Sequence, residues 1–202
     1  KRELVDWYHL NSRLIHVIHN GVDVERFNPQ LDGTGIRERY SIGESPLVVF
    51  VGRMVPYKGP QCLLEAIPRV LAEVPEAKFM FVGSARFDLV SVREVVKDSR
   101  TRKAIVLTGH VDEEVLPECY ASCDVFCYPS LWEGFGLTPA EAQAVGKPVV
   151  AFRTSALPEV VEDGVTGLLV PPGDSAALSK SIIMLLRDPD LRVKMGYEAR
   201  KR

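Results

Sequence analysis

The sequence lacks the features of several protein classes. No apolar run approaches the roughly 18 residues that a membrane-spanning helix requires, and no signal peptide opens the chain. There is no basic excess of the kind typical of nucleic-acid-binding proteins, since the formal net charge is -2. These absences predict a cytoplasmic protein with no nucleic-acid partner. The first residue is not Met, so we expect the natural protein to extend upstream.

The sequence also lacks a recognisable metal-binding pattern. Cys62, Cys119, Cys123 and Cys127 form no Cys-x2-Cys knuckles, and no His pair accompanies them. An Asp-x-Asp triplet begins at Asp188, but its central proline and the preference of Asp for helix N-caps fit a turn between two helices better. We therefore predict no metal site, and cysteines that serve as small buried side chains in a reducing compartment.

The composition is that of an ordinary folded domain. Of the 202 residues, 46% are hydrophobic and 26% are charged, which argues against disorder. This length is sufficient for one domain with a full core. We expect residues 1–202 to form a single domain.

Short apolar runs alternate with helical patterns along the chain. Runs rich in β-branched or aromatic residues predict buried strands at Leu14–Ile18, Leu47–Val51, Lys78–Val82, Ile105–Thr108, Val125–Tyr128 and Val149–Phe152. Apolar stripes at helical spacing occur at Leu63, Ile67, Val70, Leu71 and Val74, and again at Leu178, Ile182, Leu185 and Leu186. Asp174 precedes the second stripe as its predicted N-cap. This alternation predicts an α/β fold with a doubly wound, parallel, Rossmann-like sheet. Ligands bind such sheets outside the carboxyl ends of the strands.

A cationic loop follows the predicted strand at 47–51. The strand ends at Gly52, the loop carries Arg53 and Lys58, and a helix is predicted to begin near Pro60. A cation at a helix N-terminus is disfavoured by about 0.3–1 kcal/mol, and an anion held between Lys58 and the helix end would reverse this effect. The loop is therefore a candidate anion site. The alternative is two solvated surface cations beside glycines that serve the turn.

A second loop, at 129–136, joins another strand to a helix and contains two glycines. Gly134 and Gly136 allow the backbone to approach a ligand, and the N–H groups up to Thr138 would face an anion at the start of the helix. Two glutamates flank this stretch. Glu141 has an alternative interpretation as a structural residue, the glutamate of a capping box with Thr138 as N-cap. Glu133 has an alternative interpretation as a loop carboxylate in water.

These motifs occur together and in order with three others, which are His19-Asn20-Gly21-Val22-Asp23 with Phe27, Pro158-Glu159-Val160-Val161, and Gly164 with Gly167-Leu168-Leu169-Val170. In this combination the chain resembles the glycosyl transferases group 1, a family of retaining, nucleotide-sugar-dependent enzymes with two facing Rossmann-like domains, the GT-B architecture. The hallmark of that family is a pair of glutamates separated by seven residues, here Glu133 and Glu141.

The resemblance implies that the whole chain is the C-terminal, donor-binding domain, and that the N-terminal acceptor domain is absent from it. Arg53 and Lys58 would bind the donor diphosphate and stabilise the leaving group, Glu133 would contact the transferred hexose, and Glu141 would hold the ribose hydroxyls. The nucleotide sugar would further contact Gly52, His110, Gly134, Phe135, Gly136, Leu137 and Thr138.

The implied substrate is a UDP-, GDP- or ADP-linked sugar, with no cofactor. The parent enzyme would be peripheral to a membrane if its acceptor is a lipid. The chain by itself would bind nucleotide without turnover. Two alternatives stay open, which are a nucleotide-sugar epimerase or hydrolase on the same architecture, and a non-catalytic nucleotide-binding module.

The chain departs from the family pattern at three places. Ser155-Ala156 stands where the family often has a Gly-Gly pair, Ala85 stands where a glycine often follows Gly83, and His19 replaces a common proline. A turn that needs a positive φ would be strained at the first two of these sites, because a side chain disfavours that conformation.

Overall fold

The computed structural model describes residues 1–84, 96 and 98–202. In these residues, six parallel strands form one sheet in the order β3-β2-β1-β4-β5-β6, which is the Rossmann order and confirms the predicted fold. The strands are β1 Leu47–Val51, β2 Lys78–Val82, β3 Ile105–Gly109, β4 Val125–Tyr128, β5 Val149–Phe152 and β6 Gly167–Val170. Four predicted strands agree at both ends, and β3 is one residue longer than predicted. The sequence patterns did not identify β6 as a strand.

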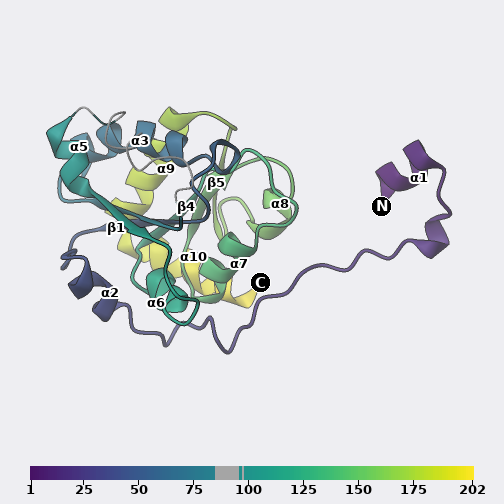
Figure 1. Cartoon of the computed structure of the whole chain (residues 1–202), viewed down its shortest axis with the longest axis horizontal. Coiled ribbons are helices and arrows are strands. Elements are labelled where there is room, and N and C mark those ends of the chain that lie inside the picture. The colour runs from purple at the N-terminus through teal and green to yellow at the C-terminus, as the bar shows by residue number, and fades with distance from the viewer. Residues whose placement is uncertain (85–95, 97) are drawn as a thin grey trace.

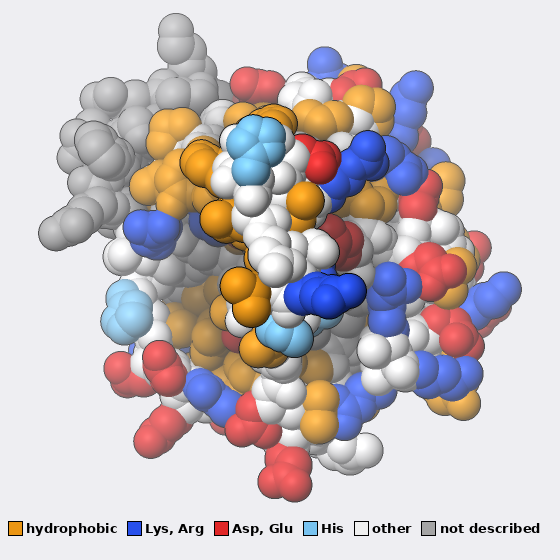
Figure 2. Space-filling view, turned by 90° about the vertical axis from the view of Figure 1, so that its right-hand side faces the viewer, with side chains coloured by type: hydrophobic (Ala, Val, Ile, Leu, Met, Phe, Trp, Pro, Cys, Tyr) orange, Lys and Arg blue, Asp and Glu red, His pale blue; other side chains and the backbone are white. Residues whose placement is uncertain are grey.

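The predicted strand at Leu14–Ile18 is wrong. The N-terminal segment contains only α1 (Arg2–Tyr8) and the 3₁₀ turn η1 (Ser12–Leu14), and it projects from the body of the molecule (Figure 1). Leu14 is 79% exposed and Ile18 is 88% exposed. None of the strand pairings among the described residues includes this segment, so its apolar side chains have no sheet to cover them. Hydrophobic side chains accordingly lie along the middle of the face in Figure 2.

Helices lie on both sides of the sheet (Figure 1). They are α2 Thr34–Arg39, η2 Pro56–Lys58, α3 Pro60–Glu73, α5 Ser99–Ala104, α6 Leu116–Ala121, α7 Leu137–Ala144, α8 Leu157–Val160, α9 Ser175–Arg187 and α10 Pro189–Lys201. Every residue of β1, β4 and β5 is buried, as expected for strands that are covered on both faces. Both predicted apolar stripes are buried, and Asp174 caps α9 by accepting a hydrogen bond from the backbone N–H of Ala177 at 2.8 Å.

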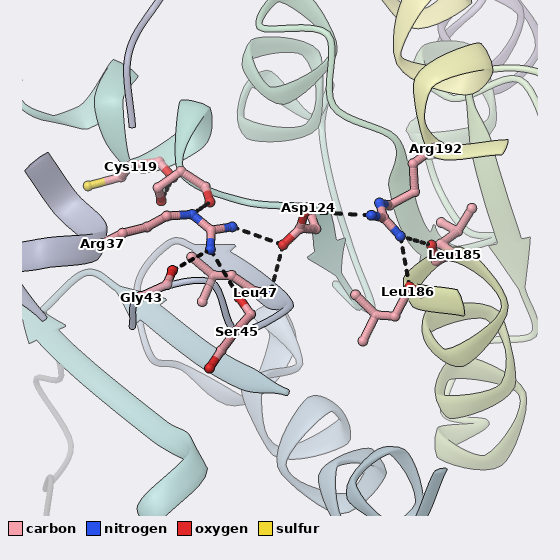
Figure 3. Close-up of polar contacts among 10 residues, drawn as sticks. Arg37, Gly43, Ser45, Leu47, Cys119, Asp124, Leu185, Leu186 and Arg192 are labelled. Carbon is pink, nitrogen blue, oxygen red and sulfur yellow. Dashed lines mark hydrogen bonds and ion pairs between the residues drawn. The ribbon is translucent and has the colours of Figure 1, made fainter. Parts of the chain in front are cut away.

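An acidic side chain ties two helices to the amino ends of β1 and β4, away from the carboxyl edge of the sheet (Figure 3). The Asp124 carboxylate accepts hydrogen bonds from Arg37 Nη2 at 2.9 Å and from the backbone N–H of Leu47 at 2.8 Å. Arg192, on α10, forms an ion pair with the other carboxylate oxygen at 3.8 Å. One carboxylate thus fixes α2 and α10 against the start of the two central strands.

The Asp-x-Asp triplet serves as a helix cap. Asp188 is the N-cap of α10, and its side chain accepts a hydrogen bond from the backbone N–H of Leu191 at 2.9 Å, which confirms the predicted turn. Across residues 1–84, 96 and 98–202, no cluster of three or more His, Cys, Asp or Glu side chains is placed to hold a metal ion. In the same residues, no helix has both the length and the apolar character to cross a bilayer.

All four cysteines are buried and free, as predicted for packing residues. Burial raises the pKa of Cys119 to about 11 and that of Cys123 to about 12. Since the thiolate is the reactive form, we expect the native protein at pH 8 to leave all four thiols unreacted with Ellman's reagent over minutes. The same protein unfolded in guanidinium chloride should release four equivalents at once. Rapid reaction of the native protein would contradict this burial.

Candidate functional site

The candidate site lies at the carboxyl edge of β1 and β4, where the strand order reverses from one side of the sheet to the other. The loop after β1 and the loop after β4 contact each other there. The carbonyl oxygen of Tyr57 accepts hydrogen bonds from the backbone N–H of Leu131 at 2.8 Å and from the Ser130 hydroxyl at 3.1 Å. A Cβ atom at Gly59 would lie 1.8 Å from the carbonyl oxygen of Pro129, so the two backbones touch.

Lys58 and Glu133 meet at this junction. They form an ion pair, and their side chains are only 16% and 9% exposed. The Tyr128 hydroxyl, at the end of β4, lies 2.9 Å from Lys58 Nζ and 2.6 Å from Glu133 Oε1. The carboxylate therefore accepts from both partners. This excludes the interpretation of Glu133 as a solvated loop carboxylate.

The environment keeps Lys58 positively charged. Burial acts to lower the pKa of Lys58, but its hydrogen bonds to Glu133 and Tyr128 outweigh burial and raise that pKa above the ordinary value. The pKa of the Tyr128 hydroxyl is also raised, first by burial and then by its hydrogen bond to Glu133. Tyr128 thus remains a neutral phenol beside a charged pair at neutral pH.

Arg53, in the same loop as Lys58, is exposed to solvent. Its guanidinium group donates a hydrogen bond to the hydroxyl of Tyr57 and lies 5.8 Å from the centre of that ring. Lys58 Nζ lies 5.5 Å from the same ring. The structure therefore brings both predicted cations to one aromatic side chain, with Lys58 inside the junction and Arg53 at its rim.

The helix that follows the second loop begins two residues earlier than a capping box with Thr138 as N-cap requires. Gly136 is the N-cap of α7, with a φ of 103° and no side chain to form a cap hydrogen bond. Thr138 lies inside the first turn, so the capping-box interpretation of Thr138 and Glu141 is wrong. The positive φ, which glycine adopts without strain, turns the chain into the helix before Thr138 is reached. The first N–H groups of α7, from Leu137 and Thr138, have no partner within the helix.

A pocket of ≈ 470 Å³ opens at this helix end. Its lining includes seven predicted site residues, which are Lys58, Glu133, Gly134, Phe135, Gly136, Leu137 and Thr138. Tyr128 and Asn20, which were not predicted as site residues, line it as well. The other predicted residues, Gly52, Arg53, His110 and Glu141, are not part of this lining. The pocket thus combines a half-buried cation, a carboxylate and a helix N-terminus.

Glu141 lies one helical turn beyond the pocket, on the same face of α7 as Leu137, because residues four apart share a helix face. Its Oε2 accepts a hydrogen bond of 2.6 Å from the hydroxyl of Tyr120 on α6. Burial raises the pKa of Glu141 above the ordinary value, Tyr120 and Arg26 act to lower it, and Glu113 acts to raise it further. Glu113 belongs to the loop that follows β3.

The loop that follows β3 is the third predicted part of the site. β3 ends at Gly109, and His110 is exposed directly after it, at the same edge of the sheet as the other two loops. Arg26 donates a hydrogen bond to the carbonyl oxygen of Glu113, so the segment after residue 22 is attached to this loop. No contact of the His110 side chain indicates a function, and its proposed place beside a base stays a prediction.

The geometry can be compared with known proteins. The family model described as "Glycosyl transferases group 1" matches residues 34–202. The chain belongs to this family. It is 36% identical over 188 residues to the GDP-mannose-dependent alpha-(1-6)-phosphatidylinositol monomannoside mannosyltransferase of Mycolicibacterium smegmatis, covering 89% of this chain and 49% of that protein. It is 33% identical over 207 residues to the D-inositol 3-phosphate glycosyltransferase of Corynebacterium jeikeium, covering 98% of this chain and 49% of that protein.

Solved structures show the same relationship. HepE of Anabaena, determined in complex with UDP and glucose, is 27% identical with a TM-score of 0.82, and the match covers 95% of this chain and 52% of that chain. The C-terminal domain of a glycosyl transferase group 1 family protein (LpcC) from Francisella tularensis is 28% identical with a TM-score of 0.77, covering 90% of this chain and 95% of that chain. The chain spans about half the length of the curated relatives it matches.

One departure from the group 1 pattern is visible in the structure. Ser155, where the family often has glycine, adopts a φ of 50°, in the left-handed region that disfavours a side chain. The predicted strain at this position is therefore confirmed. The departure at Ala85 lies outside the described residues.

Three residues near the group 1 motifs were not predicted as site residues from the sequence. Tyr128 ends a predicted strand at the ligand-binding edge, so its position was a usable signal. Asn20 lies in a recognised motif, but nothing in the sequence places it beside the second loop. Tyr120 is 0% exposed, and its sequence context predicts an ordinary core aromatic residue. Its contact with Glu141 is visible only in the structure.

A second pocket of ≈ 420 Å³ lies between the segment His19–Val24 and helices α7, α8 and α10. It shares Asn20 and Phe135 with the first pocket but contains neither Lys58 nor Glu133, and most of its surface is apolar. Its lining includes Arg200 and Arg202, but Arg200 donates hydrogen bonds to the carbonyl oxygens of Phe27 and Ala144, and Arg202 forms an ion pair with Glu162. The first pocket joins a cation to a helix N-terminus, which is the arrangement that favours an anion, so we assign the candidate site to it.

Proposed function

We propose that this chain is the donor-binding domain of a retaining, two-domain glycosyltransferase that transfers a hexosyl group from a nucleoside-diphosphate sugar to an acceptor hydroxyl. The observation that carries this proposal is the placement of Lys58 and Glu133 in one pocket at the N-terminus of α7. The match to nearly the whole of a C-terminal domain, and to only half of longer relatives, supports the assignment as one domain of two.

The diphosphate would lie between Lys58 and the first N–H groups of α7, with Arg53 reaching in from the rim. Cleavage of the sugar–phosphate bond leaves negative charge on the diphosphate, and donors already aimed at that charge stabilise the transition state. A cation about 4 Å from a phosphate oxygen contributes roughly 4 kcal/mol at an effective dielectric constant near 20. Two such cations and a helix end supply what a divalent metal supplies elsewhere, so no cofactor is required.

The sugar and the nucleoside would extend in opposite directions from this point. Glu133, which pairs with Lys58, would accept hydrogen bonds from hydroxyls of the transferred hexose. Glu141 lies one turn along α7, about 5.4 Å further, and would accept hydrogen bonds from the ribose diol. The loop after β3, with His110, would lie beside the base. The pocket volume of ≈ 470 Å³ is within the usual range for a small-molecule site.

The rest of the reaction would depend on the second domain. Retention would proceed by attack on the same face of the sugar that the diphosphate leaves, so no enzymic nucleophile is assigned. The acceptor would be bound by an N-terminal domain, and we expect this chain alone to bind nucleotide without transfer. The mannosyltransferase of Mycolicibacterium smegmatis is GDP-mannose-dependent, and HepE was determined in complex with UDP, which supports GDP- and UDP-sugars as candidates. An ADP-sugar stays a third candidate. A lipid acceptor would place the parent enzyme at the cytoplasmic surface of a membrane.

The test is calorimetric titration of this chain with UDP, GDP and ADP, with and without EDTA. We expect one nucleotide to bind, with no effect of EDTA. Arg53→Ala should weaken that binding about 10-fold, because a charge-assisted hydrogen bond contributes about 1.5–3 kcal/mol. Its unfolding midpoint should be unchanged, because Arg53 is exposed.

Arg69→Ala is the matched control, since Arg69 is an exposed arginine on α3 whose side chain contacts only its own helix among the interactions of the described residues. It removes the same charge and should leave binding unchanged. Equal and negligible binding of all three nucleotides to the wild type would contradict the proposal. Measurable sugar transfer by this chain alone would contradict the expected inactivity.

A further inference from the structure

Tyr120 is a buried phenol whose hydroxyl is directed at Glu141. The side chain is 0% exposed, and the hydroxyl donates a hydrogen bond of 2.6 Å to Glu141 Oε2. The ring packs edge-on against Phe27, with centroids 5.8 Å apart, and in a tilted arrangement against Phe126 at 5.3 Å. Aromatic neighbours from two other segments therefore fix the ring, and the ring fixes the position of the hydroxyl.

The protonation states make this contact a stable one. Burial and the nearby charge of Glu141 raise the pKa of Tyr120 well above its ordinary value, so the phenol keeps its proton and remains a donor. The hydrogen bond from Tyr120 opposes the effect of burial on the pKa of Glu141 and favours its carboxylate form. In the described part of the chain, the hydrogen bonds of the Glu141 side chain involve Oε2 alone, which leaves Oε1 for a ligand.

A glutamate side chain on a helix surface samples several rotamers, and each must be restricted when a ligand binds. A donor that already holds one carboxylate oxygen removes that cost before binding occurs. We propose that Tyr120 is a positioning residue for the ribose, which presets the Glu141 carboxylate so that Oε1 accepts from the 2′- or 3′-hydroxyl of the bound nucleotide. This inference rests on the proposed function, because it needs a nucleotide whose ribose reaches Glu141.

The competing explanation is that the hydrogen bond only joins α6 to α7. A structural role would affect every ligand of the site alike. A positioning role would affect only ligands that carry the ribose hydroxyls. A nucleoside diphosphate and its 2′,3′-dideoxy counterpart share the base and the diphosphate, so the pair separates the two explanations.

The experiment is titration of wild type and Tyr120→Phe with whichever of UDP, GDP and ADP the wild type binds, and with its 2′,3′-dideoxy form. Tyr120→Phe keeps the ring and removes only the donor. We expect it to weaken binding of the ribonucleotide about 10-fold, the effect of one lost hydrogen bond near 1.4 kcal/mol, and to leave binding of the dideoxynucleotide within about 2-fold. In a Glu141→Gln background, the same change should have little further effect on the ribonucleotide.

Tyr128→Phe is the matched control, because it also removes a phenolic donor of 2.6 Å to a partly buried glutamate, Glu133. That contact lies at the diphosphate end of the site, so this variant should weaken the ribonucleotide and the dideoxynucleotide by the same factor. Urea unfolding of each variant verifies that the folded protein is being titrated.

The outcomes separate this inference from the proposed function. If the wild type binds no nucleotide, the proposed function fails, and this inference fails with it. If the wild type binds but Tyr120→Phe weakens both nucleotides equally, or neither, the inference alone is overturned. A full 10-fold loss that persists in the Glu141→Gln background would also overturn it, because Tyr120 would then act without Glu141.

Discussion

Lys58→Met is expected to lower the free energy of unfolding by about 3 kcal/mol and to weaken nucleotide binding about 100-fold. The stability loss follows because Glu133 is only 9% exposed and would lose the cation that pairs with it. Removal of one partner from a buried ion pair typically costs 3–5 kcal/mol. The binding loss follows because Lys58 is the one cation among the residues that line the pocket. Urea unfolding and calorimetric titration measure the two effects.

A second substitution separates the two effects. Adding Glu133→Gln to Lys58→Met removes the unpaired charge, so most of the lost stability should return while nucleotide binding stays weak. Lys201→Met is the control for a surface pair, because Lys201 and Glu198 are 51% and 37% exposed, and its effect on unfolding should be far smaller. An unchanged free energy of unfolding in Lys58→Met would contradict this expectation. It would support the alternative interpretation of Glu133 as a solvated loop carboxylate.

The central strands were predictable because their sequence signal is local. β1, β2, β4 and β5 are each a run of four or five mostly apolar residues, and burial on both faces makes such runs continuous rather than alternating. The run at 14–18 has the same composition, yet Ile18 is 88% exposed. The hydrophobicity of a run indicates that its burial would be favourable. Whether the run pairs with a neighbouring strand and becomes buried depends on the rest of the fold.

The site was predictable where it follows from strand ends. Lys58 and Glu133 follow adjacent parallel strands, so the rule that ligands bind at the carboxyl edge brings their loops together. The contacts made by Tyr120 and the entry into α7 were not predictable. The sequence from Thr138 to Glu141 fits a capping box, but the φ of 103° at Gly136 starts the helix two residues earlier. This backbone angle rules out the capping box for Glu141, and no side-chain pattern records that angle.

The contact between the two loops is tested by Gly59→Ala. Gly59 has a φ of 72°, and a Cβ atom there would lie 1.8 Å from the carbonyl oxygen of Pro129. The matched control is Gly43→Ala, with a φ of 58° and no heavy atom within 4 Å of the added Cβ. Both variants carry the left-handed backbone cost of about 1–2 kcal/mol, which is all that the control should lose.

Gly59→Ala must in addition push apart two backbones, because neither the carbonyl of Pro129 nor residue 59 can rotate out of the contact. We expect its free energy of unfolding to fall about 3 kcal/mol below that of Gly43→Ala, within the range of severe single substitutions. The displaced loops carry Lys58 and Glu133, so the folded fraction should also bind nucleotide more weakly than the control does. Urea unfolding of both variants, followed by titration below the onset of unfolding, measures these effects. Equal losses in the two variants would mean that the loops do not touch, and that Lys58 and Glu133 do not share one pocket.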